Sequence, residues 1–165
     1  ECVEGAGNFP KRFNALKVRS LGSLKVVGVI ADSEEDAQAT AQRWSALFAD
    51  VAPSIDRPCS LLQLPTNQAA GAFEALVLSA LGGEPVVACA INFRDCVRSV
   101  IAPRTLAQYD KIAVQAWLSA SLGQAYGNVF KAQQQSEQVL LNYDHAAFAP
   151  IKQFVSGLLA ELEVG

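Results

Sequence analysis

KVVGVIA, at Lys25–Ala31, decides the fold, because it is an unbroken apolar and β-branched run rather than an alternating one. Such runs are typical of strands in a parallel sheet that is covered on both faces. The next residues, DSEED at 32–36, predict the start of a helix, with Ser33 as its N-cap and Asp36 three residues further on. A second apolar run, SLLQL at Ser60–Leu64, predicts the following strand. Strand, helix and strand together predict parallel pairing through a right-handed crossover.

Apolar residues at helical spacing predict most of the other elements. The helix between the strands is expected to bury a stripe of Ala37, Ala41, Trp44, Leu47, Phe48 and Val51, and the last helix one of Ile151, Phe154, Val155, Leu158, Leu159 and Leu162. Further helices are expected over Pro10–Ser20, 73–81, Val86–Val100, 106–120 and from Pro150 onward. Val86–Ile91 alone also fits a strand. A strand end is expected at 1–4 and an irregular segment at Gln124–Leu141. We therefore expect one α/β domain over 1–165, with a central, mostly parallel sheet flanked by helices in 1–82 and a mainly helical part in 83–165.

Composition excludes several classes of function. The chain has 165 residues, of which 51% are hydrophobic and 18% charged, with a formal net charge of −3. Bulk electrostatic attraction to nucleic acid or to an anionic membrane is therefore not expected, and any phosphate must be bound through a local site or a metal. The apolar stretches are too short to span a membrane. We expect a cytoplasmic protein without a signal peptide.

The four cysteines do not form a recognisable metal or redox motif. None of them is paired in a C-x-x-C spacing, and His145 is the single histidine. Cys89 and Cys96 lie seven residues apart, so on a helix they share a face but are too distant to bridge. We expect buried free thiols. The apolar helical half also permits a homo-oligomer.

Acidic side chains follow the predicted strands. Glu4 follows the first strand, Asp32 and Glu34 follow the second, and Glu74 comes soon after the third. Ligands of open α/β sheets bind beyond the carboxyl ends of strands, and Mg²⁺ prefers carboxylate oxygens, so an acidic magnesium crevice is one interpretation. The other is structural: Asp32 to Asp36 suit a helix start, and Glu4 and Glu74 suit a solvated surface. Similarly, Asp144-His145 suits a helix cap better than catalysis.

The order of short motifs resembles the TOPRIM domain of topoisomerases, primases and overcoming-lysogenization-defect nucleases. More closely, the chain is similar to short bacterial and archaeal TOPRIM-like proteins of unknown function, which share V-E-G, D-A-D, P-D-N and leucine–glutamate motifs. The corresponding stretches are Val3-Glu4-Gly5, Asp32-Ser33-Glu34, Pro65-Thr66-Asn67 and Gly71-Ala72-Phe73-Glu74, followed by Lys111, Ala116-Trp117-Leu118 and Asp144–Phe148.

This resemblance implies a TOPRIM-like sheet and magnesium-dependent cleavage of phosphodiester bonds in nucleic acid. By position, Glu4 would be the catalytic acid or base, and the metal ligands would be Asp32, Glu34, Asp36 and Glu74. Asn67 and Lys111 would contact the substrate.

The chain also departs from the family pattern. Glu34 replaces the second aspartate of D-A-D, Thr66 replaces the aspartate of P-D-N, and Asn8 stands where an aspartate is frequent. The interval from Glu4 to Asp32 is also short for a TOPRIM domain. The alternative is therefore a non-catalytic TOPRIM-like module whose metal site has eroded, and which binds a protein or nucleotide partner.

Overall fold

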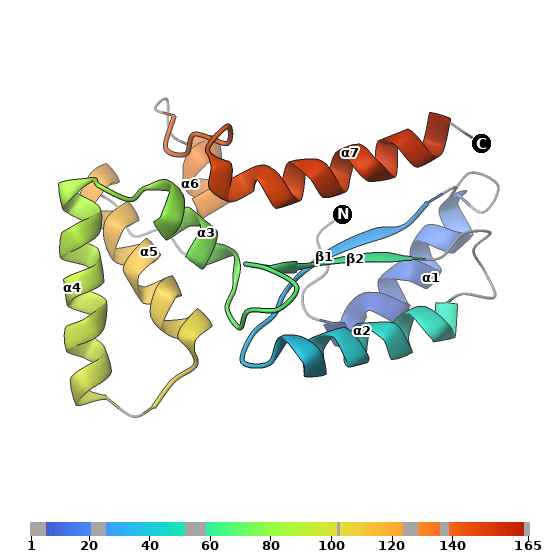
Figure 1. Cartoon of the computed structure of the whole chain (residues 1–165), viewed down its shortest axis with the longest axis horizontal. Coiled ribbons are helices and arrows are strands. Elements are labelled where there is room, and N and C mark those ends of the chain that lie inside the picture. The colour runs from blue at the N-terminus through green and yellow to red at the C-terminus, as the bar shows by residue number, and fades with distance from the viewer. Residues whose placement is uncertain are drawn as a thin grey trace.

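The computed structural model describes residues 6–20, 26–51, 59–101, 103–123, 129–135 and 139–163. Within these ranges the chain is a mixed α/β fold around a small parallel sheet (Figure 1). Strands β1 (Gly28–Asp32) and β2 (Ser60–Leu64) pair in register, from Gly28 beside Ser60 to Asp32 beside Leu64. Helix α2 (Ala37–Val51) connects them, as the strand–helix–strand pattern predicts.

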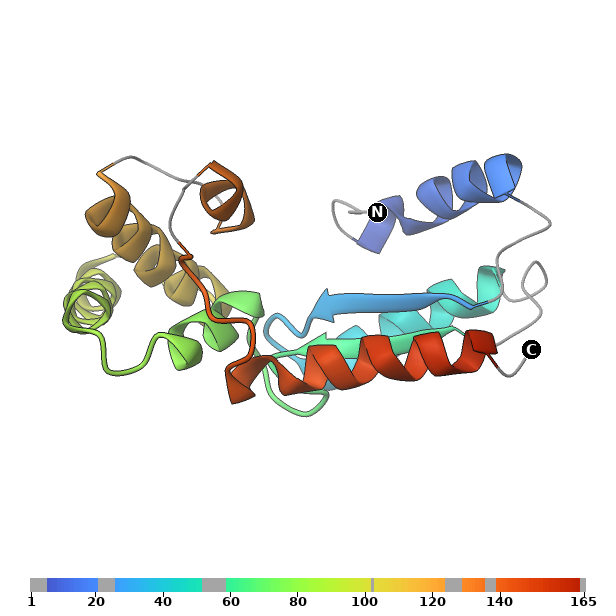
Figure 2. The ribbon, with the colours of Figure 1, turned by 90° about the horizontal axis from the view of Figure 1, so that it is seen from above.

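Helices cover the two faces of the sheet (Figures 1 and 2). On one face lie α1 (Phe9–Ser20), which follows the 3-10 turn η1 (Ala6–Asn8), and α2. Their aromatic rings interlock, with the Phe9 and Trp44 centroids 5.2 Å apart in an edge-to-face arrangement. Val29 and Ala31 of β1 pack against this cluster. On the other face α7 (Ala149–Glu163) runs beside the strands, and its side chains Leu158 and Phe154 lie over Gly28.

A second group of helices forms the other end of the elongated molecule (Figure 1). It contains α3 (Phe73–Ala80), α4 (Pro85–Val100), α5 (Leu106–Leu122) and α6 (Val129–Gln135). Their core includes the fully buried Val77, Ala113 and Leu118, and extends to Leu62 and Leu64 of the sheet. The 3-10 turn η3 (Ala146–Phe148) then leads into α7, which returns to the sheet. The helical second half of the sequence therefore contributes to both ends of the fold.

Most of the predicted elements are confirmed. β2 has the expected bounds, and α1, α3, α4, α5 and α7 differ from the predicted helices by only a few residues. The strand alternative for Val86–Ile91 is wrong, because this segment lies inside α4. The expected irregular segment contains a helix, α6. The strand predicted at 1–4 lies outside the described residues. Within those residues the sheet consists of two parallel strands, β1 and β2, and is not the central TOPRIM-like sheet that the resemblance implies.

The start of α2 differs from the prediction. Asp36, not Ser33, is the N-cap: its Oδ1 accepts the backbone N–H groups of Gln38 at 2.8 Å and Ala39 at 3.0 Å. Ser33 is instead fully buried, and its hydroxyl donates to the Thr66 carbonyl at 3.1 Å. The helix begins later because Glu34 adopts a left-handed conformation, with φ of 54°, before the chain can enter the helix.

Three predictions of burial are wrong. β1 alternates in exposure instead of being covered on both faces, and Ile30 stays 43% exposed beside α7. In α7, the residues Val155, Leu159 and Leu162 are exposed, since the helix contacts the sheet along one edge of its apolar face. Cys89 and Cys96 are exposed on α4, whereas Cys59 is half-buried. None of the helices in the described ranges is both long enough and apolar enough to cross a membrane.

Candidate functional site

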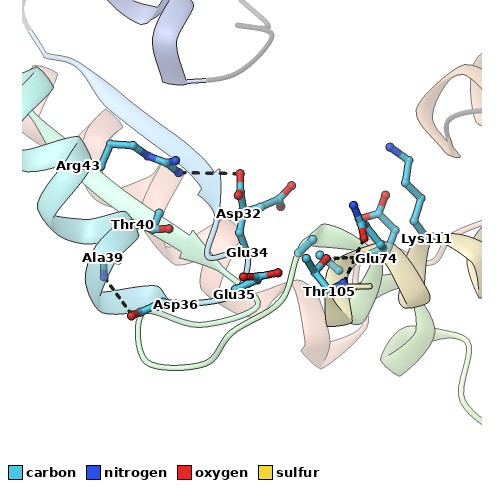
Figure 3. A pocket seen from close by; sticks show the side chains of 13 residues that line it. Asp32, Glu34, Glu35, Asp36, Ala39, Thr40, Arg43, Glu74, Thr105 and Lys111 are labelled. Carbon is cyan, nitrogen blue, oxygen red and sulfur yellow. Dashed lines mark hydrogen bonds and ion pairs between the residues drawn. The ribbon is translucent and has the colours of Figure 1, made fainter. Parts of the chain in front are cut away.

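A cleft of about 740 Å³ opens between the two ends of the molecule (Figure 3). Its walls come from the carboxyl end of β1, the start of α2, the first turn of α3 and the first turns of α5. The lining residues are mostly polar or charged: Asp32, Glu34, Glu35, Asp36, Ala39, Thr40, Arg43, Ala72, Glu74, Thr105, Ala107, Gln108 and Lys111. Four of the predicted metal ligands and Lys111 are therefore brought to one cleft.

Asp32 is the last residue of β1, and its carboxylate faces α3. Oδ1 accepts the backbone N–H of Phe73, the first residue of α3, at 2.9 Å. Burial raises the pKa of the Asp32 carboxyl above its ordinary value, and this effect outweighs the opposing Phe73 hydrogen bond. Among weaker influences, the Glu34 charge raises this pKa and the Lys111 charge lowers it. Asp32 is thus a carboxylate whose charge is only partly compensated.

Glu74 enters the same cleft from the first turn of α3. Burial is the main reason that the pKa of its carboxyl is raised, and the negative charge of Asp32 adds to the effect. Lys111, from α5, lowers the pKa of Glu74 and Asp32 alike. Figure 3 shows Glu74 and Lys111 together on one side of the cleft and the Asp32–Glu34 segment on the other. The cleft therefore holds two carboxylates with raised pKa, and the ammonium group of Lys111 is close enough to lower the pKa of both.

Glu34 and Asp36 are engaged elsewhere. The Glu34 main chain pairs with Gly71 through two hydrogen bonds of 2.8 and 2.7 Å, and its side chain points toward α2, with the Arg43 Nη2 atom 3.9 Å from Oε1. The Asp36 Oδ1 atom caps α2. Both side chains line the cleft but already have partners.

The acidic side chains of the cleft are the residues that could hold a metal ion. No group of three or more His, Cys, Asp or Glu side chains in the described ranges is close enough together to hold a metal. Glu4 lies outside those ranges. The candidate ligands are thus Asp32 and Glu74, and one or two carboxylates with retained waters and substrate phosphates are a common way for proteins to bind Mg²⁺. Asp32 and Glu74 line the same cleft and interact electrostatically, but they do not form the larger ligand set that the resemblance implies.

Two other predicted residues have local partners. The Asn67 Oδ1 atom accepts the Gln63 N–H at 2.8 Å, which fixes the turn after β2, and Asn67 is not among the residues that line the cleft. His145 caps η3, with Nδ1 accepting the Ala147 N–H at 3.1 Å. Asp144 pairs with Lys152, and this ion pair lowers the pKa of its carboxyl. The predicted capping role therefore belongs to His145, at the turn η3, whereas Asp144 forms an ion pair.

Sequence reasoning missed Arg43, Thr105 and Gln108 as cleft residues. Thr105 and Gln108 form a capping box at the start of α5: Thr105 Oγ1 accepts the Gln108 N–H, and Gln108 Oε1 accepts the Thr105 N–H, both at 3.1 Å. The spacing T-x-x-Q is visible in the sequence. Its position opposite β1 is not, because it depends on how α5 packs against α3.

No family model matches this chain, and neither a curated protein nor a solved structure is significantly similar to it. The TOPRIM-like relationship therefore remains a prediction from short motifs. Function must be argued from the geometry of the cleft itself.

Proposed function

We propose that this protein is a TOPRIM-like, magnesium-dependent enzyme that cleaves phosphodiester bonds in nucleic acid, with the cleft beyond β1 as its active site. The observation that carries the proposal is the placement of Asp32 and Glu74 on one cleft. Both carboxyls have a raised pKa, and the charge of Lys111 acts on both.

The electrostatics of the cleft favour a cation with an attached phosphate. The negative charge of Asp32 raises the energy of the charged form of Glu74, and a divalent cation bound between the two carboxylates would offset this repulsion. Lys111 and Arg43, on opposite sides of the cleft, supply positive charge for phosphate oxygens. Because the whole chain carries a net charge of −3, attraction to nucleic acid must come from such a local arrangement.

The residues divide into distinct roles in this proposal. Asp32 and Glu74 hold the metal ion, which would polarise the phosphate and neutralise charge that develops during cleavage. The Phe73 N–H keeps the Asp32 carboxylate oriented. Lys111 binds a non-bridging phosphate oxygen. By the resemblance, Glu4 is the general acid or base, and Glu34 is an additional ligand once Arg43 turns toward phosphate.

A second candidate is the non-catalytic TOPRIM-like module. It is favoured by one specific finding: Asp36, one of the expected metal ligands, caps α2, and the Glu34 side chain turns toward Arg43. Such a module would bind a phosphate-bearing partner through Lys111 and Arg43 without a metal, so its binding would persist in a chelator.

Cleavage assays separate the two candidates. Single-stranded and duplex DNA and RNA are incubated with the wild type, Asp32→Asn, Glu74→Gln and Glu4→Gln in Mg²⁺ or Mn²⁺, with Glu84→Gln, an exposed glutamate outside the cleft, as matched control. The enzyme proposal predicts chelator-sensitive cleavage that Asp32→Asn, Glu74→Gln and Glu4→Gln each lose and the control keeps. Absence of cleavage on every substrate, with binding that survives in chelator and is weakened by Lys111→Ala, would establish the module instead.

A further inference from the structure

The outer face of α4 carries an apolar stripe that the fold leaves open. The exposed side chains Val86, Cys89, Phe93, Cys96 and Val100 follow one another at intervals of three, four, three and four residues. These are the a and d positions of two heptads, the spacing by which one helix packs along another. We call these five residues the α4 stripe.

The α4 stripe is distinct from the face that α4 uses within the chain. Val87 and Ala90 are buried against the helical core, and Arg94 pairs with Asp110 of α5 at 2.8 Å. By contrast, Phe93 is 53% exposed and Val100 is 75% exposed. Figure 1 shows α4 at the far end of the molecule, with α5 on its inner side. The stripe therefore lies on a surface with room for another helix.

We propose that the α4 stripe is a dimer interface, occupied by the α4 stripe of a second copy of this chain. The stripe reads Val, Cys, Phe, Cys, Val in either direction, so it offers an identical stripe the same sizes of side chain in the same order. In an antiparallel pair, a two-fold axis through Phe93 would place each side chain opposite one of the same kind. The proposal is independent of the chemistry assigned to the cleft.

The charge of the surface also favours a second copy. The exposed residues beside the stripe, Asn92 and Ser99, are small and neutral, and the stripe itself holds no ionisable group other than its thiols. Two chains of net charge −3 repel each other least where neither presents charge. A nucleic acid or an anionic lipid surface would instead need Lys or Arg on this face, and the stripe has none.

The area of the stripe places the contact at the small end of specific interfaces. The stripe extends over fourteen residues, or about 21 Å of helix. Val86, Phe93 and Val100 are 40%, 53% and 75% exposed, which together with the two exposed thiols leaves roughly 400 Å² of apolar and thiol surface per copy. Pairing two copies buries about 800 Å² of stripe surface, and the neutral rim residues Asn92 and Ser99 bring the total toward the roughly 1,000 Å² at the lower end of specific interfaces.

The test is the solution mass of the full chain, measured by sedimentation equilibrium. The wild type is expected to have twice the mass of one chain at micromolar concentration, and Phe93→Glu to be a monomer with an unchanged circular dichroism spectrum. Leu159→Glu is the matched control, since Leu159 on α7 is 55% exposed and lies far from the stripe. If Phe93→Glu does not fold, Val100→Glu at the most exposed stripe position replaces it.

Two further readouts test the chemistry of the interface. Because the α4 stripe is uncharged, raising salt from about 50 mM to about 500 mM should not weaken the dimer. Mild oxidation with copper phenanthroline should link two chains through Cys89 or Cys96, and Cys89→Ser with Cys96→Ser should abolish this product. A monomeric wild type, a dimer that salt dissociates, or a dimer that survives both Phe93→Glu and Val100→Glu would overturn the proposal.

Discussion

The carboxylate of Asp32 accepts the backbone amide of Phe73, 41 residues later in the chain, over 2.9 Å. This single bond joins the end of β1 to the first turn of α3. It therefore sets the position of Glu74, the next residue, relative to Asp32. The Asp32–Phe73 hydrogen bond therefore holds both candidate metal ligands, Asp32 and Glu74, on the same cleft.

The bond to Phe73 can be separated from the charge of Asp32 by substitution. Asp32→Asn keeps an oxygen that accepts the Phe73 N–H, whereas Asp32→Ala removes it. We expect Asp32→Ala to be less stable than Asp32→Asn by about 1 kcal/mol, the net value of one such hydrogen bond. Urea unfolding of both variants measures the difference. Equal stability of the two would show that the bond does not hold α3 against β1.

The raised pKa of Glu74 predicts how its removal affects stability. The folded chain holds the Glu74 proton more tightly than the unfolded chain, in which the pKa is near its ordinary value of 4.5. The free energy of unfolding therefore falls as pH rises from the ordinary pKa through the raised one, and this loss is absent in more acidic solution. Glu74→Gln has no ionisable carboxyl at this position, so its free energy of unfolding should not show this decrease.

In chelator, Glu74→Gln should melt about 1 to 2 °C above the wild type near neutral pH, a small effect because solvent screens this site. The advantage should shrink toward pH 4. Melting curves of both proteins over this range measure it, with Glu84→Gln as control. Magnesium should reverse the order, because it binds the folded wild type. A variant that is less stable at neutral pH in chelator would contradict the expected sign.

Gly71 is required by backbone geometry at the cleft. Its φ is +140°, and a Cβ atom there would lie 2.8 Å from Pro65 Cδ. Gly71 also pairs with Glu34 through two backbone hydrogen bonds. We expect Gly71→Ala to destabilise the fold by about 2 to 3 kcal/mol and to displace Glu34.

Gly157, exposed inside α7 with no atom near its missing Cβ, provides the opposite case. Gly157→Ala should stabilise the protein by about 0.5 to 1 kcal/mol through helix propensity. Denaturant unfolding of the two alanine variants compares them directly. Similar effects of both substitutions would contradict the strained turn at Gly71.

The capping box of α5 gives a prediction on the other wall of the cleft. Thr105→Ala loses the acceptor for the Gln108 N–H and should cost about 1 kcal/mol, while Thr105→Ser should retain most of that stability. Unfolding by urea measures both. If serine fails as fully as alanine, the methyl group rather than the hydroxyl stabilises this helix start.

Periodicity predicted the elements well because they obey local rules. The bounds of β2, the buried Trp44 and Val51 on α2, and the start of α7 near Pro150 all follow from spacing and from the residues that end helices. Where two residues satisfied the same local rule for a helix start, the predicted N-cap was wrong. Ser33 and Asp36 are both good caps, and the left-handed turn at Glu34 selected Asp36.

Burial and site geometry could be predicted less well, because they depend on contacts between distant segments. An unbroken apolar run at β1 predicts two covered faces, but α7 covers only part of one, so Ile30 is exposed. Of the acidic residues expected after the strands, Asp32, Glu34 and Glu74 line one cleft, whereas Glu4 lies outside the described residues. That Asp36 caps a helix and Glu34 turns toward Arg43 depends on loop conformation, which no spacing in the sequence encodes.

The most direct test of the proposed function is calorimetric titration of Mn²⁺ or Mg²⁺ into the wild type, Asp32→Asn, Glu74→Gln and their double variant, with Glu84→Gln as control. The proposal predicts one site in the wild type and in the control, weakened at least about tenfold by each cleft substitution, which is about 1.4 kcal/mol, and lost in the double variant. A wild type that binds no metal at millimolar concentration, or a double variant that binds it unchanged, would contradict it.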